Sequence, residues 1–229
     1  NITPRKGIQA MVIAPTRELA VQIAAEMQKF GKYMGCKTTA IYGKVALEPQ
    51  IQSMATADIV VGTPGRILDH LERKTLPTNN IKHVVLDEAD KLVDMGFIED
   101  IKRILNHTPK EKQMSLFGAT ISQEVESIKH TYMQNPTIVK VQTLHEDLLE
   151  QFYYDVPQKE KFSLLVHLLN KEQTKRVIIF CSKITTVDLL TQNLRNNKLI
   201  AEKIHGRMAQ PKRLRVMQDF NKGLPNILV

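Results

Sequence analysis

Three carboxylates are crowded into four positions of one short stretch, residues 84–91, which reads VVLDEADK. Asp87, Glu88 and Asp90 follow an apolar run with the composition of a buried strand. Acids this close repel one another and resist burial, so a compensating partner is expected. Two partners fit these residues. The acids can stabilise the start of a following helix, by about 0.3 to 1 kcal/mol each, or bind Mg²⁺ together with phosphate oxygens.

The elements that would position these acids alternate along the chain. Apolar runs of strand type occur at 10–15, 38–43, 58–64, 83–90, 113–120, 138–141, 151–157, 176–181, 201–206 and 226–229. Helical spacing of apolar residues is clearest at 18–35, 97–108, 161–172, 185–197 and 212–223. This alternation predicts an α/β fold, in which parallel sheets carry helices on both faces. Ligands of such sheets bind at the carboxyl ends of the strands, where the three acids lie.

The polar segment 142–150 interrupts the alternation, and a second series of strands and helices begins after it. Its position predicts two domains, 1–141 and 151–229, joined by a linker at 142–150. A chain of 229 residues is long enough for two cores. Both domains are expected to be truncated, because the chain starts about ten residues before its first strand and stops within the apolar run NILV.

The composition is that of a globular protein with a basic surface. The 32 Lys and Arg residues outnumber the 24 Asp and Glu residues, and the net charge of +8 favours a polyanionic partner such as nucleic acid. Aromatic residues make up 5% and Trp is absent, so contacts to the nucleic-acid backbone are expected rather than base stacking.

The expected location is intracellular. No apolar run reaches the roughly 18 residues of a membrane span, and the N-terminus lacks the layout of a signal peptide. The two cysteines, Cys36 and Cys181, are far apart in the sequence, which indicates reduced thiols rather than a disulfide or a zinc site. The cytoplasm is the expected compartment, or the nucleus if the source is eukaryotic.

Four further motifs follow predicted strands: PTRELA at 15–20, TPGR at 63–66, GAT at 118–120 and VIIFCS at 177–182. Together with the tetrapeptide DEAD at 87–90, their order and spacing resemble those of the DEAD-box RNA helicases, over essentially the whole chain. The resemblance implies two RecA-like domains that close around ATP, Mg²⁺ and single-stranded RNA. It implies a monomeric ATP-dependent RNA helicase that couples ATP hydrolysis to RNA binding and local duplex unwinding.

The same resemblance implies a role for each acid. Asp87 would hold Mg²⁺ through water, and Glu88 would orient and deprotonate the water that attacks the γ-phosphate of ATP. Phosphoryl transfer needs such charge neutralisation and a positioned nucleophile. Asp90 would connect the ATP site to three coupling residues, or would only cap a helix. The three are Gly118, Ala119 and Thr120.

Two positions depart from the family pattern. Relatives usually have Ser where this chain has Gly118, and the lost hydroxyl is expected to weaken the coupling of hydrolysis to strand separation by about 0.5 to 1.5 kcal/mol. Relatives often have a Gly-Gly pair where this chain has Gly43 and Lys44. The lysine adds a side chain and a charge near the expected path of the RNA.

RNA contacts in the first domain would, by the resemblance, follow three strands and go to phosphate and sugar, without sequence preference. The implied residues are Pro15, Thr16, Arg17, Gly43, Thr63, Pro64, Gly65 and Arg66. Hydroxyls can donate to RNA, arginines can pair with phosphates, and Gly65 permits close backbone approach. The alternative for Arg17 and Arg66 is a surface salt bridge or a helix cap.

In the second domain, the stretch 204–223 resembles a family segment that contains a Gln-x-x-Arg motif. The residues implied near RNA or the domain interface are Ser182, Gly206, Gln210 and Arg213. The alternative is a basic, solvated helix, and three other cations of this stretch are assigned to it. They are Lys212, Arg215 and Lys222.

No G-x-x-x-x-G-K-[ST] sequence occurs in the chain, so the family's phosphate-binding loop is expected upstream of Pro15. The arginine finger is expected beyond Val229, and its loss alone lowers the rate of phosphoryl transfer by about 10³ to 10⁵. Expressed alone, the chain is therefore expected to be deficient in ATPase activity. Two other functions stay open: a non-catalytic RNA-binding or scaffold module, and a DNA helicase of a related superfamily, which would not need 2′-hydroxyl contacts.

Overall fold

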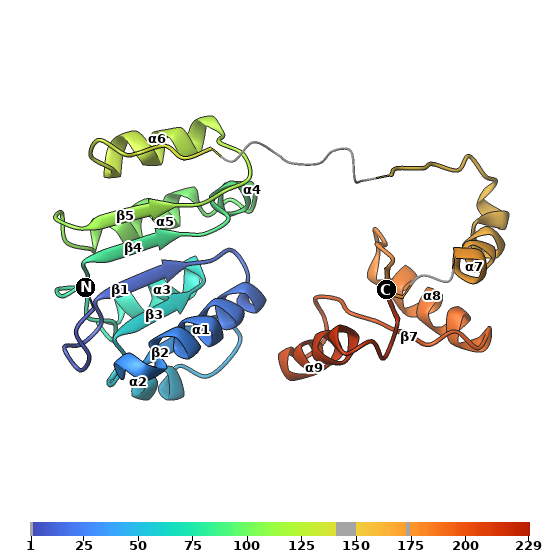
Figure 1. Cartoon of the computed structure of the whole chain (residues 1–229), viewed down its shortest axis with the longest axis horizontal. Coiled ribbons are helices and arrows are strands. Elements are labelled where there is room, and N and C mark those ends of the chain that lie inside the picture. Colours follow the sequence, from blue (N-terminus) through green and yellow to red (C-terminus); the bar gives the residue numbers. More distant parts are fainter. Residues whose placement is uncertain (1, 141–149, 173–174) are drawn as a thin grey trace. The chain divides into compact units, whose positions relative to one another are not determined.

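The computed structural model describes residues 2–140, 150–172 and 175–229 (Figure 1). It divides the chain into two compact units, Asn1–Lys140 and Val141–Val229. The linker predicted at 142–150 lies outside the described residues, apart from Glu150. Within the described ranges, no helix is both long enough and apolar enough to cross a membrane.

The first unit is built on a sheet of five parallel strands in the order β2-β3-β1-β4-β5. The strands are β1 Ala10–Ile13, β2 Thr38–Ile41, β3 Ile59–Gly62, β4 His83–Leu86 and β5 Gln113–Leu116. Their last residues pair with one another, so all five strands end at one margin of the sheet, the carboxyl edge. The loops that follow the strands therefore lie next to one another along this edge. In that order they are 42–47, 63, 14–16, 87–88 and 117–122.

Helices cover both faces of this sheet, as predicted. They are α1 Arg17–Gly31, α2 Glu48–Met54, α3 Pro64–Glu72, α4 Ala89–Asp94, α5 Ile98–Asn106 and α6 Gln123–Tyr132, with a 3-10 helix η1 at Lys32–Met34. Alternate residues of β1 enter different cores: Ala10 and Val12 pack with α1, whereas Met11 and Ile13 join the larger core under α2 to α6. Burial on both faces explains why β1 is an uninterrupted apolar run.

Local signals explain where three of the helices begin. The Oγ1 of Thr16 accepts a hydrogen bond from the N–H of Leu19 at 3.3 Å and caps α1, and Ser122 caps α6 in the same way. Pro64 occupies the first position of α3, where its missing N–H costs nothing. The spacing of apolar residues did not predict α2, α3, α4 or α6. It did predict α5, which has nine residues, because Ile101, Ile104 and Leu105 recur at helical spacing and are buried.

The strands end earlier than their apolar runs do. The strand predicted at 58–64 stops at Gly62, because proline cannot donate to a strand ladder and Pro64 instead begins α3. β4 stops at Leu86, so the three acids lie beyond the strand. The strands predicted at 138–141 and 151–157 are wrong for the described residues 138–140 and 151–157, which are irregular.

β5 forms one margin of the sheet, and β4 is its single hydrogen-bonded neighbour among the described strands. A cavity of about 870 Å³ lies along β5 and is also lined by the segment 132–137. Phe117, which follows β5, is 59% exposed. The outer side of β5 therefore offers backbone groups and apolar surface that the described part of this unit does not cover.

The second unit contains a smaller parallel sheet in the order β6-β8-β7. Its strands are β6 Val177–Ile178, β7 Ala201–Glu202 and β8 Ile227–Leu228, and its helices are α7 Lys161–Glu172, α8 Ile184–Asn196 and α9 Gln210–Asn221, with a 3-10 helix η3 at Gln158–Glu160. Ile227 packs with α7 and α8, and Leu228 packs with α9, so helices again cover both faces. The helix predicted at 161–172 is confirmed at those bounds.

Candidate functional site

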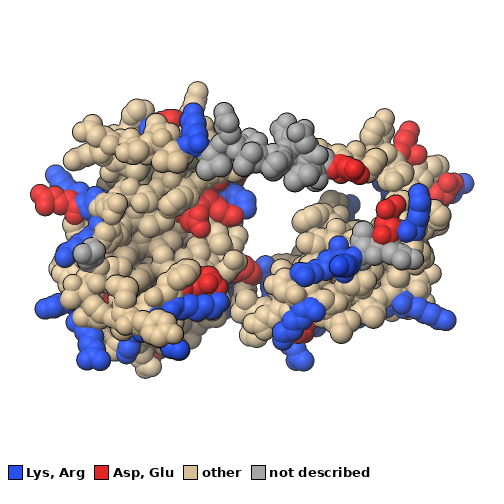
Figure 2. All heavy atoms as spheres, viewed as in Figure 1, with Lys and Arg blue, Asp and Glu red and all other residues tan. Residues whose placement is uncertain are grey.

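The three acids of residues 87–90 lie at the carboxyl edge, where β4 passes into α4, and acidic side chains gather there in Figure 2. The N–H of Asp87 donates to the carbonyl of Ile13 at 3.0 Å, and Oδ1 of Asp87 accepts from the N–H of Glu88 at 3.0 Å. Glu88 has φ 48° and ψ 52°, a left-handed conformation that costs a non-glycine residue about 1 kcal/mol or more. This turn holds the acids at the edge of the sheet.

The carboxylate of Glu88 is paired with a lysine of its own helix. Nζ of Lys91 donates to Oε1 of Glu88 at 2.8 Å, and this hydrogen bond is the main cause that raises the pKa of Lys91. The lysine side chain is 61% exposed and the glutamate side chain 35% exposed, so water screens the pair and its strength is small. Glu88 can therefore exchange Lys91 for another partner at little cost.

Asp90 is hydrogen-bonded to two of the three residues that the family resemblance assigned to it. Its Oδ2 accepts from the N–H groups of Ala119 and Thr120, each at 3.1 Å, and from Oγ1 of Thr120 at 3.2 Å. Its Oδ1 accepts from the N–H of Lys91 at 3.1 Å. Burial alone would raise the pKa of Asp90, but these hydrogen bonds, led by those from the backbone of Thr120 and Lys91, lower it. The alternative role as a helix cap is wrong, because Glu88 occupies that position.

Gly118 lies against the same carboxylate. A Cβ at this position would be 3.4 Å from Oδ1 of Asp90 and 3.3 Å from the carbonyl oxygen of Thr120, so a serine hydroxyl would come close to Asp90. Asp90 already accepts four hydrogen bonds without it. The predicted weakening of coupling by Gly118 stays a prediction, and its expected size is smaller than the sequence suggested.

The predicted RNA-contact residues of the first unit lie on the other loops of the carboxyl edge. Pro15, Thr16 and Arg17 follow β1, Gly43 follows β2, and Thr63, Pro64, Gly65 and Arg66 follow β3. Because of the strand order, these three loops are neighbours, and the loop after β1 adjoins the acids. The rings of Pro15 and Pro64 are buried and shape the loops, whereas Thr16, Arg17 and Thr63 are partly exposed and Gly65 is exposed.

The side chain of Arg66 contacts partners within the first unit. Its side chain is 10% exposed, and Nη2 donates to the carbonyl of Val45 at 3.0 Å. Nε lies 3.7 Å from Oδ2 of Asp69, and Nη1 is buried without a hydrogen-bond partner among the described residues. The predicted pairing with an RNA phosphate stays a prediction; in this structure Arg66 holds the loop after β2 through the carbonyl of Val45.

The predicted residues of the second unit follow β6 and β7. Ser182 and Gly206 are exposed and lie in turns beyond these strands. Gln210 is the first residue of α9, and its Oε1 accepts from Nη1 of Arg213 at 3.4 Å. The glutamine and arginine of the Gln-x-x-Arg motif thus form one cluster on the first turn of α9.

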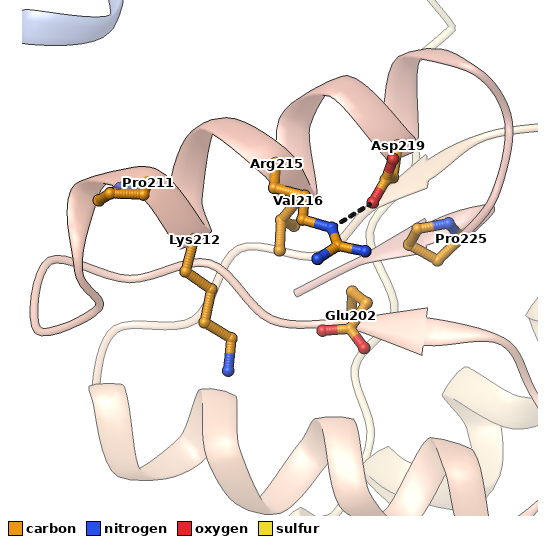
Figure 3. A pocket seen from close by; sticks show the side chains of 7 residues that line it. All are labelled: Glu202, Pro211, Lys212, Arg215, Val216, Asp219 and Pro225. Atoms are coloured by element: carbon orange, nitrogen blue, oxygen red, sulfur yellow. Dashed lines mark ion pairs between the residues drawn. The ribbon is translucent and has the colours of Figure 1, made fainter.

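A pocket beside α9 was missed by the sequence analysis (Figure 3). It has a volume of about 540 Å³, and its lining residues are Glu202, Pro211, Lys212, Arg215, Val216, Asp219 and Pro225. Nε of Arg215 is 3.8 Å from Oδ2 of Asp219, and Glu202 is ion-paired with Arg195. Two cations and two anions line the pocket, so it has no clear preference for the charge of a ligand. The spacing of Lys212 and Arg215 was visible in the sequence, but the approach of β7 was not.

Asp87 fits a Mg²⁺ ion that is bound mainly by phosphate oxygens and water better than it fits a metal ion that needs several protein ligands. Among the described residues, no group of three or more His, Cys, Asp or Glu side chains is placed to hold a metal ion. Oδ2 of Asp87 accepts no hydrogen bond within the described parts of the chain, which leaves an oxygen for a cation or its water. Mg²⁺ in nucleotide sites is held by one or two carboxylates, with phosphate oxygens and water as its other ligands.

The chain matches two family models, the DEAD/DEAH box helicase over residues 1–128 and the helicase conserved C-terminal domain over residues 160–229. It is 42% identical to the DEAD-box ATP-dependent RNA helicase CshA of Streptococcus pneumoniae serotype 4, over 99% of this chain and 44% of that protein. It is 41% identical to CshA of Geobacillus kaustophilus, over 97% of this chain and 48% of that protein. The chain spans about half the length of the curated relatives it matches.

Two solved structures share the fold. A DEAD box protein from the hyperthermophile Methanococcus jannaschii matches with a TM-score of 0.61 and 38% identity, over 99% of this chain and 62% of that chain. Dbp5 of S. cerevisiae, bound to RNA and ADP BeF3, matches with a TM-score of 0.84 and 29% identity, over 98% of this chain and 57% of that chain. The predicted α/β fold with parallel sheets is confirmed.

Proposed function

The chain belongs to the DEAD/DEAH box helicase family, and on that premise we propose that its parent protein is an ATP-dependent RNA helicase. The observation that carries the proposal is the arrangement of the carboxyl edge. Asp87, Glu88 and Asp90 lie there beside the loop after β1, which adjoins the loop after β3, and Asp90 is bonded to the loop after β5. The named activity of the CshA relatives, and the RNA and ADP BeF3 in the Dbp5 structure, support it.

The acids of this chain would act on the nucleotide in different ways. When bound, Mg²⁺ neutralises charge on the phosphates of ATP. Asp87 would hold that cation through water with its Oδ2. Glu88 would exchange its weak partner Lys91 for a water molecule, orient this water and accept its proton. Asp90 would fix the loop after β5, so that a shift of α4 is passed on to Ala119 and Thr120.

RNA would lie across the loops after β2, β3 and β1, with contacts to phosphate and sugar and hence no sequence preference. In the second unit, the candidates for RNA or interface contact are Ser182, Gly206, Gln210 and Arg213. We propose a monomer in the cytoplasm as the working form of the parent protein. The state of Cys36 and Cys181, both free thiols, supports a reducing compartment.

The test is RNA-stimulated ATP hydrolysis by the parent protein and by its Glu88→Gln variant. The variant should lose at least about 100-fold in turnover, because a positioned general base contributes about 10²- to 10⁴-fold, and it should still bind RNA. Glu99→Gln is the matched control. Glu99 is also paired with a lysine three residues on, at 2.8 Å, but it lies on α5 and not on a loop of the carboxyl edge. This control should keep full turnover.

Other outcomes of this assay decide between the alternatives. A parent protein that binds RNA tightly but does not hydrolyse ATP would be the non-catalytic RNA-binding or scaffold module. A parent protein that binds DNA and RNA of the same sequence equally well would contradict RNA as the substrate, because 2′-hydroxyl contacts distinguish the two. The 229-residue chain itself contains no G-x-x-x-x-G-K-[ST] sequence, and it should release little phosphate from ATP.

A further inference from the structure

The loop after β2, residues 42–46, presents a lysine in a backbone conformation that lysine seldom adopts. Lys44 has φ 63°, in the left-handed region, and its side chain is exposed. A side chain in this region costs free energy that glycine would avoid, and such a conformation persists only when the surrounding structure imposes it. The contacts of the loop show what imposes it.

A buried glutamine of α2 holds both sides of the loop. Gln50 is 7% exposed. Its Oε1 accepts from the N–H of Tyr42 at 3.1 Å, and its Nε2 donates to the carbonyls of Ala46 at 2.9 Å and Tyr42 at 3.4 Å. The backbone two residues before Lys44 and two residues after it is therefore tied to one side chain.

Arg66 holds the middle of the loop. Its guanidinium donates to the carbonyl of Val45, directly after Lys44, and the side chain is nine-tenths buried. With Gln50, Arg66 fixes the backbone on each side of Lys44. The lysine is thus presented by a fixed loop, whose backbone is held by one buried and one nearly buried side chain.

The loop that carries Lys44 is joined to the next loop of the carboxyl edge. The N–H of Thr63 donates to the carbonyl of Ile41 at 3.2 Å. The backbones of β2 and β3 also approach closely, since a Cβ on Gly62 would be 2.8 Å from the carbonyl oxygen of Ile41. Lys44 therefore extends the row of loops in which Thr63 and Thr16 lie.

The amine of Lys44 makes no ion pair within the described parts of the chain. An exposed, unneutralised cation on a fixed loop is suited to a phosphate of a nucleic-acid strand, because binding there releases a counterion without a cost for ordering the backbone. We propose that Lys44 contacts an RNA phosphate, and that Gln50 and Arg66 are positioning residues that present it. This inference rests on the proposed function, because it requires that RNA lie along these loops.

The test compares Lys44→Gln with Lys44→Gly in the parent protein. The probe is a labelled single-stranded oligouridylate, bound in the presence of ADP, beryllium fluoride and Mg²⁺ over a series of salt concentrations. Both variants should bind several-fold more weakly, and the slope of log affinity against log salt should fall by about 0.7, the loss of one phosphate contact on a single strand. Lys44→Gly should also unfold at a higher urea concentration than the wild type, because glycine relieves the left-handed backbone.

Lys74→Gly is the matched control. Lys74 is also exposed and has φ 58°, but it follows the end of α3, which starts at the carboxyl edge and runs back to the opposite edge. This variant should gain urea resistance in the same way as Lys44→Gly and should bind RNA with the wild-type affinity and salt slope. An equal loss of affinity for both glycine variants would overturn the inference, because it would reflect net charge alone.

Two results separate this inference from the function on which it rests. If the wild type binds the oligouridylate and both Lys44 variants bind it with unchanged affinity and salt slope, the inference is wrong and the proposed function stands. If the wild type does not bind the oligouridylate under any of these conditions, both are wrong. Weaker binding with an unchanged salt slope would also overturn the inference, because it would assign the effect to the loop and not to the charge.

Discussion

On both sides of the carboxyl edge, one side chain holds a loop by hydrogen bonds to its backbone. The side chain is an aspartate near β4 and an arginine near β2. On the β4 side, the partly exposed Asp90 ties down the loop after β5, and the sequence motif pointed to this residue. On the β2 side, the motif pointed to Arg66, which is nearly buried and supports a loop whose exposed cation is Lys44. A residue that a motif singles out can therefore also hold a neighbouring loop in place.

Removal of Asp90 tests the β4 side of this comparison and has the largest expected effect. Asp90→Ala should lower the free energy of unfolding by about 2 to 3 kcal/mol, because Ala119 and Thr120 lose a charged acceptor. Asp90→Asn keeps one acceptor oxygen and should lose about half as much. Urea denaturation of the parent protein at neutral pH measures both.

Asp94→Ala is the control for this pair. Asp94 lies on the same helix and is exposed, so its removal should change the free energy of unfolding by less than about 0.5 kcal/mol. An Asp90→Ala variant as stable as this control would show that the loop after β5 is held by other groups.

Removal of Arg66 tests the β2 side. Arg66→Ala should lower the free energy of unfolding by about 1 to 2 kcal/mol, because a nearly buried hydrogen bond and the packing of the side chain are lost. If Arg66 acts only by positioning Lys44, RNA binding should weaken while its salt slope stays close to that of the wild type, because no phosphate contact is lost with the guanidinium. A slope reduced by about 0.7 with unchanged stability would restore the role first assigned to Arg66 from the sequence.

Asp90 should make stability depend on pH, whereas Gln50 and Arg66 on the β2 side do not titrate in the acidic range. The pKa of Asp90 is lowered in the folded state, so its stabilisation is complete above the ordinary Asp pKa of about 3.9 and is lost as the pH falls through the lowered value. The stability difference between the wild type and Asp90→Asn should be constant from about pH 7 to 5 and shrink by about 1 kcal/mol at lower pH, a modest value because water screens the site. Urea denaturation at several pH values measures this difference, and a difference that grows on acidification would contradict the sign.

The smallest effect is expected for Gly118→Ser. The added hydroxyl would approach a carboxylate that already accepts four hydrogen bonds, so stability should change by less than about 0.5 kcal/mol and unwinding by the parent protein should stay the same. Duplex unwinding and urea denaturation of the variant measure the two quantities. Markedly faster unwinding would mean that the missing hydroxyl does weaken the link to Asp90.

The sequence was sufficient for the features that depend on order along the chain. Parallel strands end at one edge, so the residues that follow each strand could be placed together there. The contact of Asp90 with Ala119 and Thr120 was implied by the family resemblance and not by the order of the strands. The sequence was not sufficient where a side chain meets a distant carbonyl. Arg66 and Val45 are 21 positions apart and the contact has no periodic signature, so an exposed arginine was the natural expectation. The helix α4 was missed because its six residues complete fewer than two turns, too few to show a periodic pattern of apolar residues.

The uncovered side of β5 affects how this chain should behave in concentrated solution. Among the described strands β5 has a neighbour on one side only, and such a strand is a template for another extended segment; apolar surface such as that of Phe117 favours this pairing. Two copies that pair through their β5 strands would form one continuous sheet. This association would leave the loops of the carboxyl edge unchanged. Sample concentration is therefore a variable in each measurement on the isolated chain, and a charge placed on β5 would act as a solubility mutation.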